Sequence, residues 1–214
     1  MFRPLAVLSA VAVLAALWLG PLLTTDADSF TAHMIAHMGV VAIAAPLLAA
    51  GIAGTRFDPL NGHRFAPLAI IASLAELVVV WAWHAPALRA LARSSTLATA
   101  IEQASFLVVG LILWLSCLGH DGQDRRNAAG VLGLLMTSIH MTLLGVLLAL
   151  TPRPLYGTAP VTCLGYTLSA GTDQQLGGIL MLLIGAAVYL AGGLVLAARL
   201  LRGPDSAPHR LQRG

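Results

Sequence analysis

The sequence predicts an all-α protein, a polytopic membrane helix bundle of about six transmembrane helices with both termini in the cytoplasm. Composition is the first reason, because 58% of the 214 residues are hydrophobic and only 10% are charged. A soluble domain carries about 25% charged residues. The second reason is that the apolar residues form long runs, and a membrane-spanning helix needs about 20 in succession. Helices satisfy their own backbone hydrogen bonds in lipid, whereas an open sheet does not.

Six apolar segments are long enough to form these helices. They cover residues 5–23, 31–52, 67–84, 97–118, 128–150 and 176–201. Pro86 follows the third and Pro152 follows the fifth, where proline prevents the helix from continuing. A cleaved signal peptide is the alternative for the first segment. Signal peptides have apolar regions of only about 7–15 residues, so the sequence favours a retained span.

The chain is accordingly divided into three parts. Residues 1–30 hold the first span and an outer loop, or alternatively the signal peptide. Residues 31–201 form a five-span core, and residues 202–214 form a cytoplasmic tail.

The arginines predict the orientation of the bundle. All 12 basic residues are arginine. Nine lie on one side of the predicted spans, namely Arg3, Arg56, Arg64, Arg125, Arg126, Arg199, Arg202, Arg210 and Arg213. Three lie on the other side, namely Arg89, Arg93 and Arg153. The positive-inside rule places the richer side in the cytoplasm, so the long loop of residues 151–175 faces outward.

The second predicted span opens with two His-Met pairs, His33-Met34 and His37-Met38. Residues four apart share a helix face, so the imidazoles lie one above the other, as do the thioethers. Imidazole and thioether together suit copper, and thioether favours Cu(I). Interfacial histidines with methionines as gap-fillers are the alternative. The pattern alone leaves both interpretations open.

Further ionisable side chains gather in the outer half of the spans. His84 ends the third span beside Trp81 and Trp83, which suit a membrane interface. His140 and Met141 lie deeper in the fifth span, where ionisable groups are costly and often functional. Supporting candidates are Glu76, Glu102, Asp173 and Arg153. Interhelical hydrogen bonds are the structural alternative for the glutamates. Asp173 is expected to cap the sixth span, and membrane-boundary architecture is the alternative for the segments that hold Asp173 and Arg153.

Several classes of function have no support in the sequence. We find no HExxH motif, no phosphate-binding glycine loop and no convincing nucleophile–base pair, so the protein is not expected to be an enzyme. The sequence has no long run of basic residues, so binding of nucleic acid has no support. No CxxC motif is present. Cys117 and Cys163 fall on opposite sides of the predicted bilayer, so we do not expect them to pair.

Four motifs occur in order at the boundaries of the predicted helices. They are His33-Met-x-x-His37-Met with Ala45-Pro46-Leu47-Leu48, Trp83-His84-Ala85-Pro86, Pro152-Arg153-Pro154-Leu155-Tyr156, and Asp173-Gln-Gln-Leu-Gly-Gly178. Together they resemble the multi-span CtaG-like cytochrome c oxidase assembly factors over about residues 31–201. The resemblance implies a role in maturing haem–copper oxidases at the inner membrane. It also implies that His33, His37 and His84 are the functional histidines. Family members commonly show Glu-His where this chain has Glu102-Gln103.

The leading hypothesis is an assembly factor that handles Cu(I) on the outer, periplasmic side. Copper would come from a donor protein and pass to the catalytic subunit of a haem–copper oxidase. The candidate ligands are His33, His37, His84, His140, Met34, Met38 and Met141. A haem-binding membrane cytochrome with paired histidines is one alternative. A copper or small-solute transporter and a metal-free accessory subunit are the others.

Overall fold

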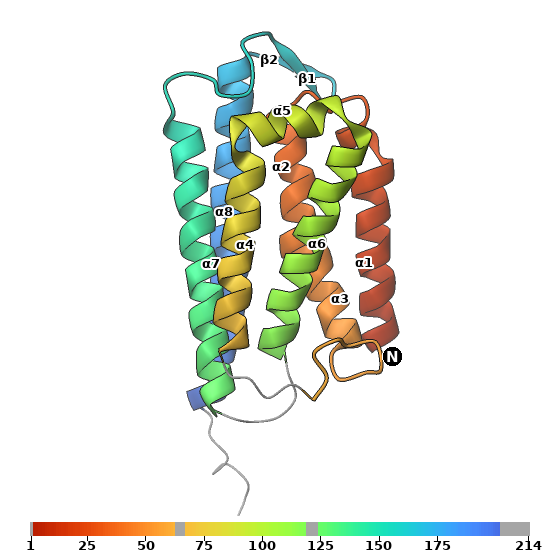
Figure 1. Cartoon of the computed structure of the whole chain (residues 1–214), viewed down its shortest axis with the longest axis vertical. Coiled ribbons are helices and arrows are strands. Elements are labelled where there is room, and N and C mark those ends of the chain that lie inside the picture. The colour runs from red at the N-terminus through yellow and green to blue at the C-terminus, as the bar shows by residue number, and fades with distance from the viewer. Residues whose placement is uncertain (1, 63–66, 119–123, 202–214) are drawn as a thin grey trace, which may run out of the picture.

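The protein is a bundle of helices capped at one end by a short helix and a β-hairpin (Figure 1). The computed structural model describes residues 2–62, 67–118 and 124–201. The elements in chain order are α1 (Phe2–Leu19), the 3-10 helix η1 (Pro21–Leu23), α2 (Phe30–Met38), the π-helix η2 (Gly39–Ala44), α3 (Ala45–Ile52), α4 (Leu68–His84), α5 (Pro86–Ser94), α6 (Thr96–Leu118), α7 (Asp124–Leu150), β1 (Val161–Cys163), β2 (Tyr166–Leu168) and α8 (Ala170–Leu201). The predicted tail, residues 202–214, lies outside this description.

The helices confirm a multi-pass membrane protein. Five are long and apolar enough to cross a membrane: α1, the continuous stretch Phe30–Ile52, α6, α7 and α8. The helix α4 passes the same test together with α5, from which it bends by 71°. Counting that bent pair as one span gives the six predicted. The last helix begins at Ala170, six residues earlier than expected.

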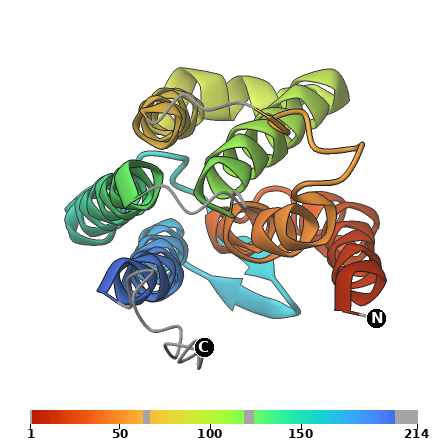
Figure 2. The same cartoon turned by 90° about the horizontal axis from the view of Figure 1, so that it is seen from below.

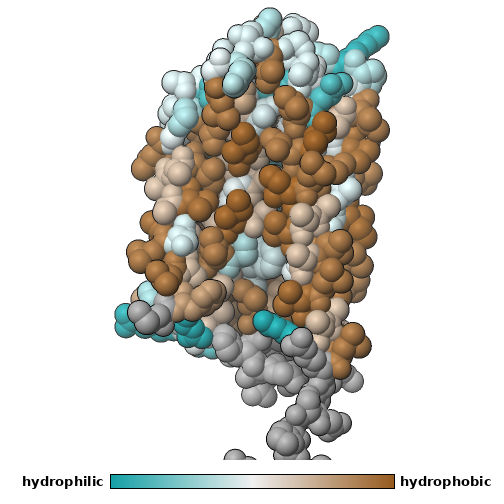
Figure 3. Space-filling view, turned by 180° about the vertical axis from the view of Figure 1, so that it is seen from behind, coloured by the Kyte–Doolittle hydropathy of each residue, from teal (hydrophilic) through white to brown (hydrophobic). Residues whose placement is uncertain are grey.

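The two ends of the bundle differ in what they carry. The helix α5 and the hairpin lie at one end, which we call the α5 end (Figure 1). The N-terminus and the end of α8 lie at the opposite end, as Figure 2 also shows. On the face seen in Figure 3, a broad apolar belt lies between more polar ends. Such a belt fits the hydrocarbon layer of a bilayer.

The sequence did not predict the helix α5, which lies across the ends of its neighbours (Figure 1). Pro86 begins it, at a position where a helix has no use for the missing N–H. Arg89 and Ala92 are buried on its inner side, whereas Leu91 is 49% exposed. The helix is therefore amphipathic and closes the α5 end above the spans.

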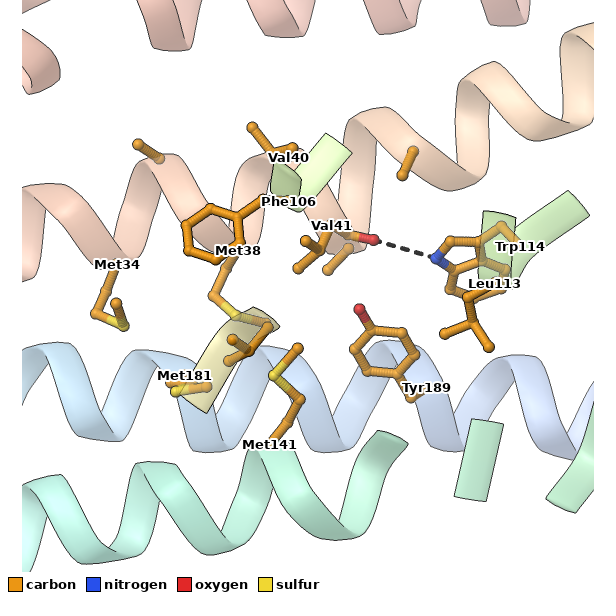
Figure 4. Close-up of a cluster of buried hydrophobic side chains, with 14 of the residues drawn as sticks. Met34, Met38, Val40, Val41, Phe106, Leu113, Trp114, Met141, Met181 and Tyr189 are labelled. Carbon is orange, nitrogen blue, oxygen red and sulfur yellow. Dashed lines mark hydrogen bonds between the residues drawn. The ribbon is translucent and has the colours of Figure 1, made fainter. Parts of the chain in front are cut away.

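A π-helical turn interrupts the second span. Pro46 has no N–H, so the helical ladder must shift around it. The N–H of Ala45 bonds to Val40 instead of Val41. This shift leaves the carbonyl of Val41 without a helical partner, and the indole Nε1 of Trp114 donates to it at 3.1 Å (Figure 4). Turns of this kind are frequent at functional sites.

The long loop between α7 and α8 contains the hairpin formed by β1 and β2. Leu164 and Gly165 form its tip with φ values of 49° and 84°, which suits the two-residue turn of a tight hairpin. The backbone N–H of Leu164 donates to the carboxylate of Asp26 at 3.2 Å. Cys163 is buried in β1, and neither it nor Cys117 forms a disulfide.

The helices α7 and α8 pack closely through glycines. A Cβ atom on Gly178 would lie 2.8 Å from the carbonyl oxygen of Gly145, and one on Gly145 would lie 2.8 Å from that of Gly178. Only glycine permits this approach. Gly178, Gly185 and Gly192 are spaced seven residues apart on α8, and each faces neighbouring side chains or backbone. Small residues of this kind let helices meet closely in lipid.

Candidate metal centre

Three histidines from two helices meet at the α5 end. His33 and His37 lie one turn apart on α2, and His84 is the last residue of α4. Their ring centroids are 5.3 Å apart for His37 and His84, 5.6 Å for His33 and His84, and 6.4 Å for His33 and His37. Each is at most 4% exposed. We call these three residues the histidine cluster.

Most ring nitrogens of the histidine cluster have no hydrogen-bond partner in the described part of the chain. They are both nitrogens of His33, both of His37, and Nε2 of His84. The Nδ1 of His84 differs, because it lies 2.6 Å from the carbonyl oxygen of Val80. A carbonyl only accepts, so Nδ1 carries the proton and Nε2 keeps its lone pair. Metal-binding histidines commonly hold their second nitrogen in this way.

Aromatic rings enclose the histidine cluster. Phe106 from α6 lies 4.1 Å from the ring of His37, measured between centroids. Phe30 lies edge-on to His84 at 6.1 Å and stacks on Tyr156 at 4.4 Å. The hydroxyl of Tyr156 donates to the backbone carbonyl of His84 at 2.8 Å, and burial raises the pKa of this phenol well above its usual value. The cluster is therefore shielded from water on the loop side.

Two charged side chains lie next to the histidine cluster. Glu102 is fully buried on α6, and its Oε2 lies 3.7 Å from Nδ1 of His33. Neither carboxylate oxygen has a hydrogen-bond partner among the described residues. Arg89 on α5 is 5% exposed, and burial lowers the pKa of its guanidinium while the charge of Glu102 opposes that shift. A positive and a negative group thus partly offset each other beside the imidazoles.

The spacing of the rings can be compared with that of a metal site. With a metal–nitrogen bond of about 2 Å, three imidazoles arranged trigonally around one ion have centroids about 5.5 Å apart. Two of the observed separations, 5.3 and 5.6 Å, match this value. Within the described residues, no group of three or more His, Cys, Asp or Glu is already oriented to hold a metal. The three rings are close enough to share one ion. Their side chains would have to rotate for the ring nitrogens to point at it.

The methionines lie on a different face of α2 from the histidines. Successive residues of an α-helix point about 100° apart. Met34 therefore faces Gly177 of α8, and Met38 faces Gly185. Figure 4 shows both side chains directed towards α8 and α7, where Met181 of α8 and Met141 of α7 lie. All four are fully buried. A role for the thioethers as ligands stays a prediction.

Two further predicted residues lie outside the histidine cluster. His140 on α7 is 4% exposed and both its ring nitrogens lack a partner among the described residues. Glu76 belongs to a separate polar group, in which it accepts hydrogen bonds from Tyr189 at 3.0 Å and Thr137 at 3.2 Å. This network joins α4, α7 and α8. It matches the structural alternative given for Glu76, which was interhelical hydrogen bonding.

Asp173 does not cap its own helix. Its carboxylate accepts hydrogen bonds from the hydroxyl of Ser29 and from the backbone N–H groups of Phe30 and Thr31, at 2.7, 2.6 and 3.0 Å. It therefore caps the start of α2, while Ser169 caps α8 through the N–H of Thr172. The expected cap at the sixth span is wrong, because α8 begins before this aspartate. The correction makes Asp173 a support of the histidine-bearing helix.

The two remaining motifs act as connections between helices. Gln174 donates to the carbonyl of Leu148 at 3.0 Å and accepts from the N–H of Leu155 at 2.6 Å. It thereby ties the exit of α7 to the start of α8. Arg153 is exposed on the connecting loop. Support of the metal site by Arg153 stays a prediction.

Comparison with known proteins gives one family. The sequence model of the cytochrome c oxidase caa3 assembly factor family (Caa3_CtaG) matches residues 2–203. The chain belongs to this family. No curated protein and no solved structure matches it. The assembly-factor resemblance seen in the four motifs is therefore confirmed, and its extent is greater than the expected residues 31–201 because it includes the first span.

Four residues that surround the histidine cluster were not among the predicted site residues. They are Phe30, Phe106, Arg89 and Gln103. Phe106 follows Glu102 by one helical turn, a spacing that could have shown it on the same face. Gln103 stands where family members commonly carry histidine. Its Oε1 accepts a hydrogen bond from the indole of Trp18 at 3.2 Å, so here the position joins α6 to α1.

Proposed function

We propose that this protein assists cytochrome c oxidase assembly by holding Cu(I) at the histidine cluster and passing it to the catalytic subunit. A donor protein would supply the copper, in the inner membrane, with the α5 end facing outward. Membership of the assembly-factor family supports the oxidase role. The observation that carries the copper role is the set of buried ring nitrogens of His33, His37 and His84 without partners. An unsatisfied buried polar atom costs about 1–3 kcal/mol, which a bound cation would offset.

The chemistry of the histidine cluster suits a metal that must be released again. Neutral imidazoles bind copper without the tight hold of a thiolate. The two cysteines lie on other elements than the three histidines, Cys163 in β1 and Cys117 in the last turn of α6. Neither belongs to the histidine cluster. The carboxylate of Glu102 would balance the charge of the ion. Transfer to a partner would then need only the exchange of a few imidazole bonds.

Copper analysis of the purified protein tests this proposal. Cells are grown with added copper, and the metal content of the full chain is compared with that of the double variant His33→Ala, His37→Ala. We expect copper in the parent and little in the variant, together with lower oxidase activity in cells carrying the variant. Ser105→Ala is the control, since it removes a polar group of α6 at the same end. Equal copper content and full oxidase activity in the double variant would refute the proposal.

The geometry favours a small ion over haem. The imidazoles of His33, His37 and His84 lie 5.3–6.4 Å apart and contact Phe106 and Phe30. A porphyrin needs an open slot between its axial ligands, and these rings fill the space. An absorption spectrum of the same purified protein separates the two cases. A Soret band would favour the membrane cytochrome instead.

A further inference from the structure

A cavity of about 490 Å³ opens beside the histidine cluster. It lies between the outer end of α1 with η1, the helix α5, and the first turns of α6. The helix α1 packs mainly on α3 and η2, which leaves room between it and α6. His33 lines the cavity as well as belonging to the cluster. The cavity thus connects the surface at the α5 end with the edge of the candidate metal centre.

Two buried side chains of the cavity wall have hydrogen-bond donors that no described residue satisfies. They are Nε of Arg89 and Nε2 of Gln103. Arg89 is 5% exposed and Gln103 is 4% exposed. The orientation of the amide is fixed, because the Trp18 indole can only donate and does so to Oε1 of Gln103. The amide nitrogen is therefore the group left without an acceptor.

The charge of the cavity wall selects an anion. Its lining includes Arg89, Arg93 and His33, and no aspartate or glutamate is among the described residues that line it. Arg93 is already engaged, since it donates to Asp28 and to the carbonyl of Tyr156, both at 2.7 Å. Among the described residues, Arg89 makes one long hydrogen bond, 3.5 Å to the carbonyl of Ala27, and its Nε has no acceptor. Of the two arginines in the described lining, Arg89 is therefore the one with an unsatisfied donor, and Glu102 only partly offsets its charge.

The remaining wall is apolar. Trp18, Leu22, Leu23 and Ala104 contribute to it, and tryptophan at a helix end is typical of the membrane interface. A polar anion alone would leave this surface uncovered. An anionic headgroup with a hydrocarbon tail would cover both parts, with the headgroup at Arg89 and the tail leaving between α1 and α6.

We infer that this cavity binds an anionic amphiphile through Arg89 and Gln103. The headgroup is an oxyanion, which a guanidinium recognises through charge-assisted hydrogen bonds. Two sources share this chemistry, the phosphate of an anionic phospholipid and the carboxylate of a fatty acid. The inference is independent of the proposed copper role, although a bound headgroup would lie next to the histidine cluster.

Native mass spectrometry of the full chain in neutral detergent tests the inference. The probes are phosphatidylglycerol, oleate, phosphatidylcholine with the same acyl chains as the first, and inorganic phosphate. We expect phosphatidylglycerol, oleate or both to bind at least about tenfold more tightly than phosphatidylcholine. Arg89→Gln should weaken that binding by about tenfold or more, as expected for loss of a charged hydrogen bond. The relative affinities of the first two probes identify the source.

Two further variants locate the binding site. Ala104→Trp fills the cavity and keeps every donor, and Ala104 is exposed, so the substitution spares the core. It should weaken binding even if Arg89→Gln fails to fold. Arg56→Gln removes the same charge at the opposite end of the bundle and should change nothing. Equal binding of phosphatidylcholine, unchanged binding in Ala104→Trp, or binding of inorganic phosphate as tight as that of the amphiphiles would overturn the inference.

Discussion

The Nδ1 atom of His84 lies 2.6 Å from the carbonyl oxygen of Val80, one turn earlier in α4. The backbone carbonyl of His84 in turn accepts a hydrogen bond from the hydroxyl of Tyr156. The carbonyl of His84 lies in the last turn of α4, where carbonyls have no partner in a next turn. The bend towards α5 at Pro86 therefore leaves His84 anchored at its ring and at its backbone. Such anchoring holds a binding side chain in one orientation.

Replacing His84 tests whether its free nitrogen binds copper. His84→Ala removes a ligand that α4 supplies to the two imidazoles of α2, so we expect the affinity for Cu(I) to fall by at least about tenfold. Competition with a chromophoric Cu(I) chelator measures the affinity. Trp83→Phe is the control. It removes the neighbouring indole N–H, which donates to the hydroxyl of Ser105 and not to the histidine cluster. An unchanged affinity in His84→Ala would exclude this residue from the site.

Asp173→Asn tests the cap of α2. The carboxylate accepts three hydrogen bonds at the start of this helix, and the amide would keep the shape but lose the charge and one acceptor. We expect a loss of about 1–3 kcal/mol in the free energy of unfolding, seen as a lower unfolding temperature in detergent. Asp28→Asn is the matched control. Asp28 is 76% exposed in its ion pair with Arg93, and such pairs contribute about 0–1 kcal/mol.

The six spans could be predicted because each one is a long apolar run, and lipid permits few other structures. The elements that were missed depend on tertiary contacts. The short helix α5 is amphipathic and is ordered by burial of its own inner side, which carries Arg89 and Ala92. The π-helical turn depends on Trp114 taking the carbonyl that Pro46 leaves free. Trp114 lies far from Val41 in the sequence, so the local pattern does not show this contact.

The convergence of His33, His37 and His84 followed partly from the sequence. Spacing of four predicts that the first two share a face, but only the packing of α4 against α6 and the other helices of the bundle brings the third to them. The same helical geometry places Met34 and Met38 on the side of α8. Adjacent residues of a helix point about 100° apart, so the imidazole and the thioether of each His-Met pair face different neighbours.

Tyr156→Phe tests how the outer loop supports the histidine cluster. The ring would still stack on Phe30, from which its centroid lies 4.4 Å away, but the hydrogen bond to the His84 carbonyl would be lost. We expect a decrease of about 0.5–1.5 kcal/mol in the free energy of unfolding. Tyr156→Leu should cost more, because it removes the stacking as well. Comparison of the two unfolding temperatures measures each part, and equal values would show that the stacking contributes nothing.

The closest approach of α7 and α8 predicts a sharp difference between two glycines of α8. A Cβ atom at Gly178 would lie 2.7 Å from the backbone nitrogen of Ala149 and 2.8 Å from the carbonyl oxygen of Gly145. Backbone cannot move aside as a flexible side chain does, so Gly178→Ala should destabilise the bundle by about 1–3 kcal/mol. A Cβ at Gly171, in the first turn of the same helix, would meet no atom within 4 Å.

Gly171→Ala is therefore the matched control, and alanine should favour the helix there by up to about 1 kcal/mol. Thermal unfolding in detergent is expected to show a lower transition for Gly178→Ala and an unchanged or higher one for Gly171→Ala. Because α8 also carries Asp173, which caps the histidine-bearing helix α2, we expect Gly178→Ala to reduce copper retention as well. Two variants of equal stability would mean that the glycine contact between α7 and α8 does not limit the packing of the bundle.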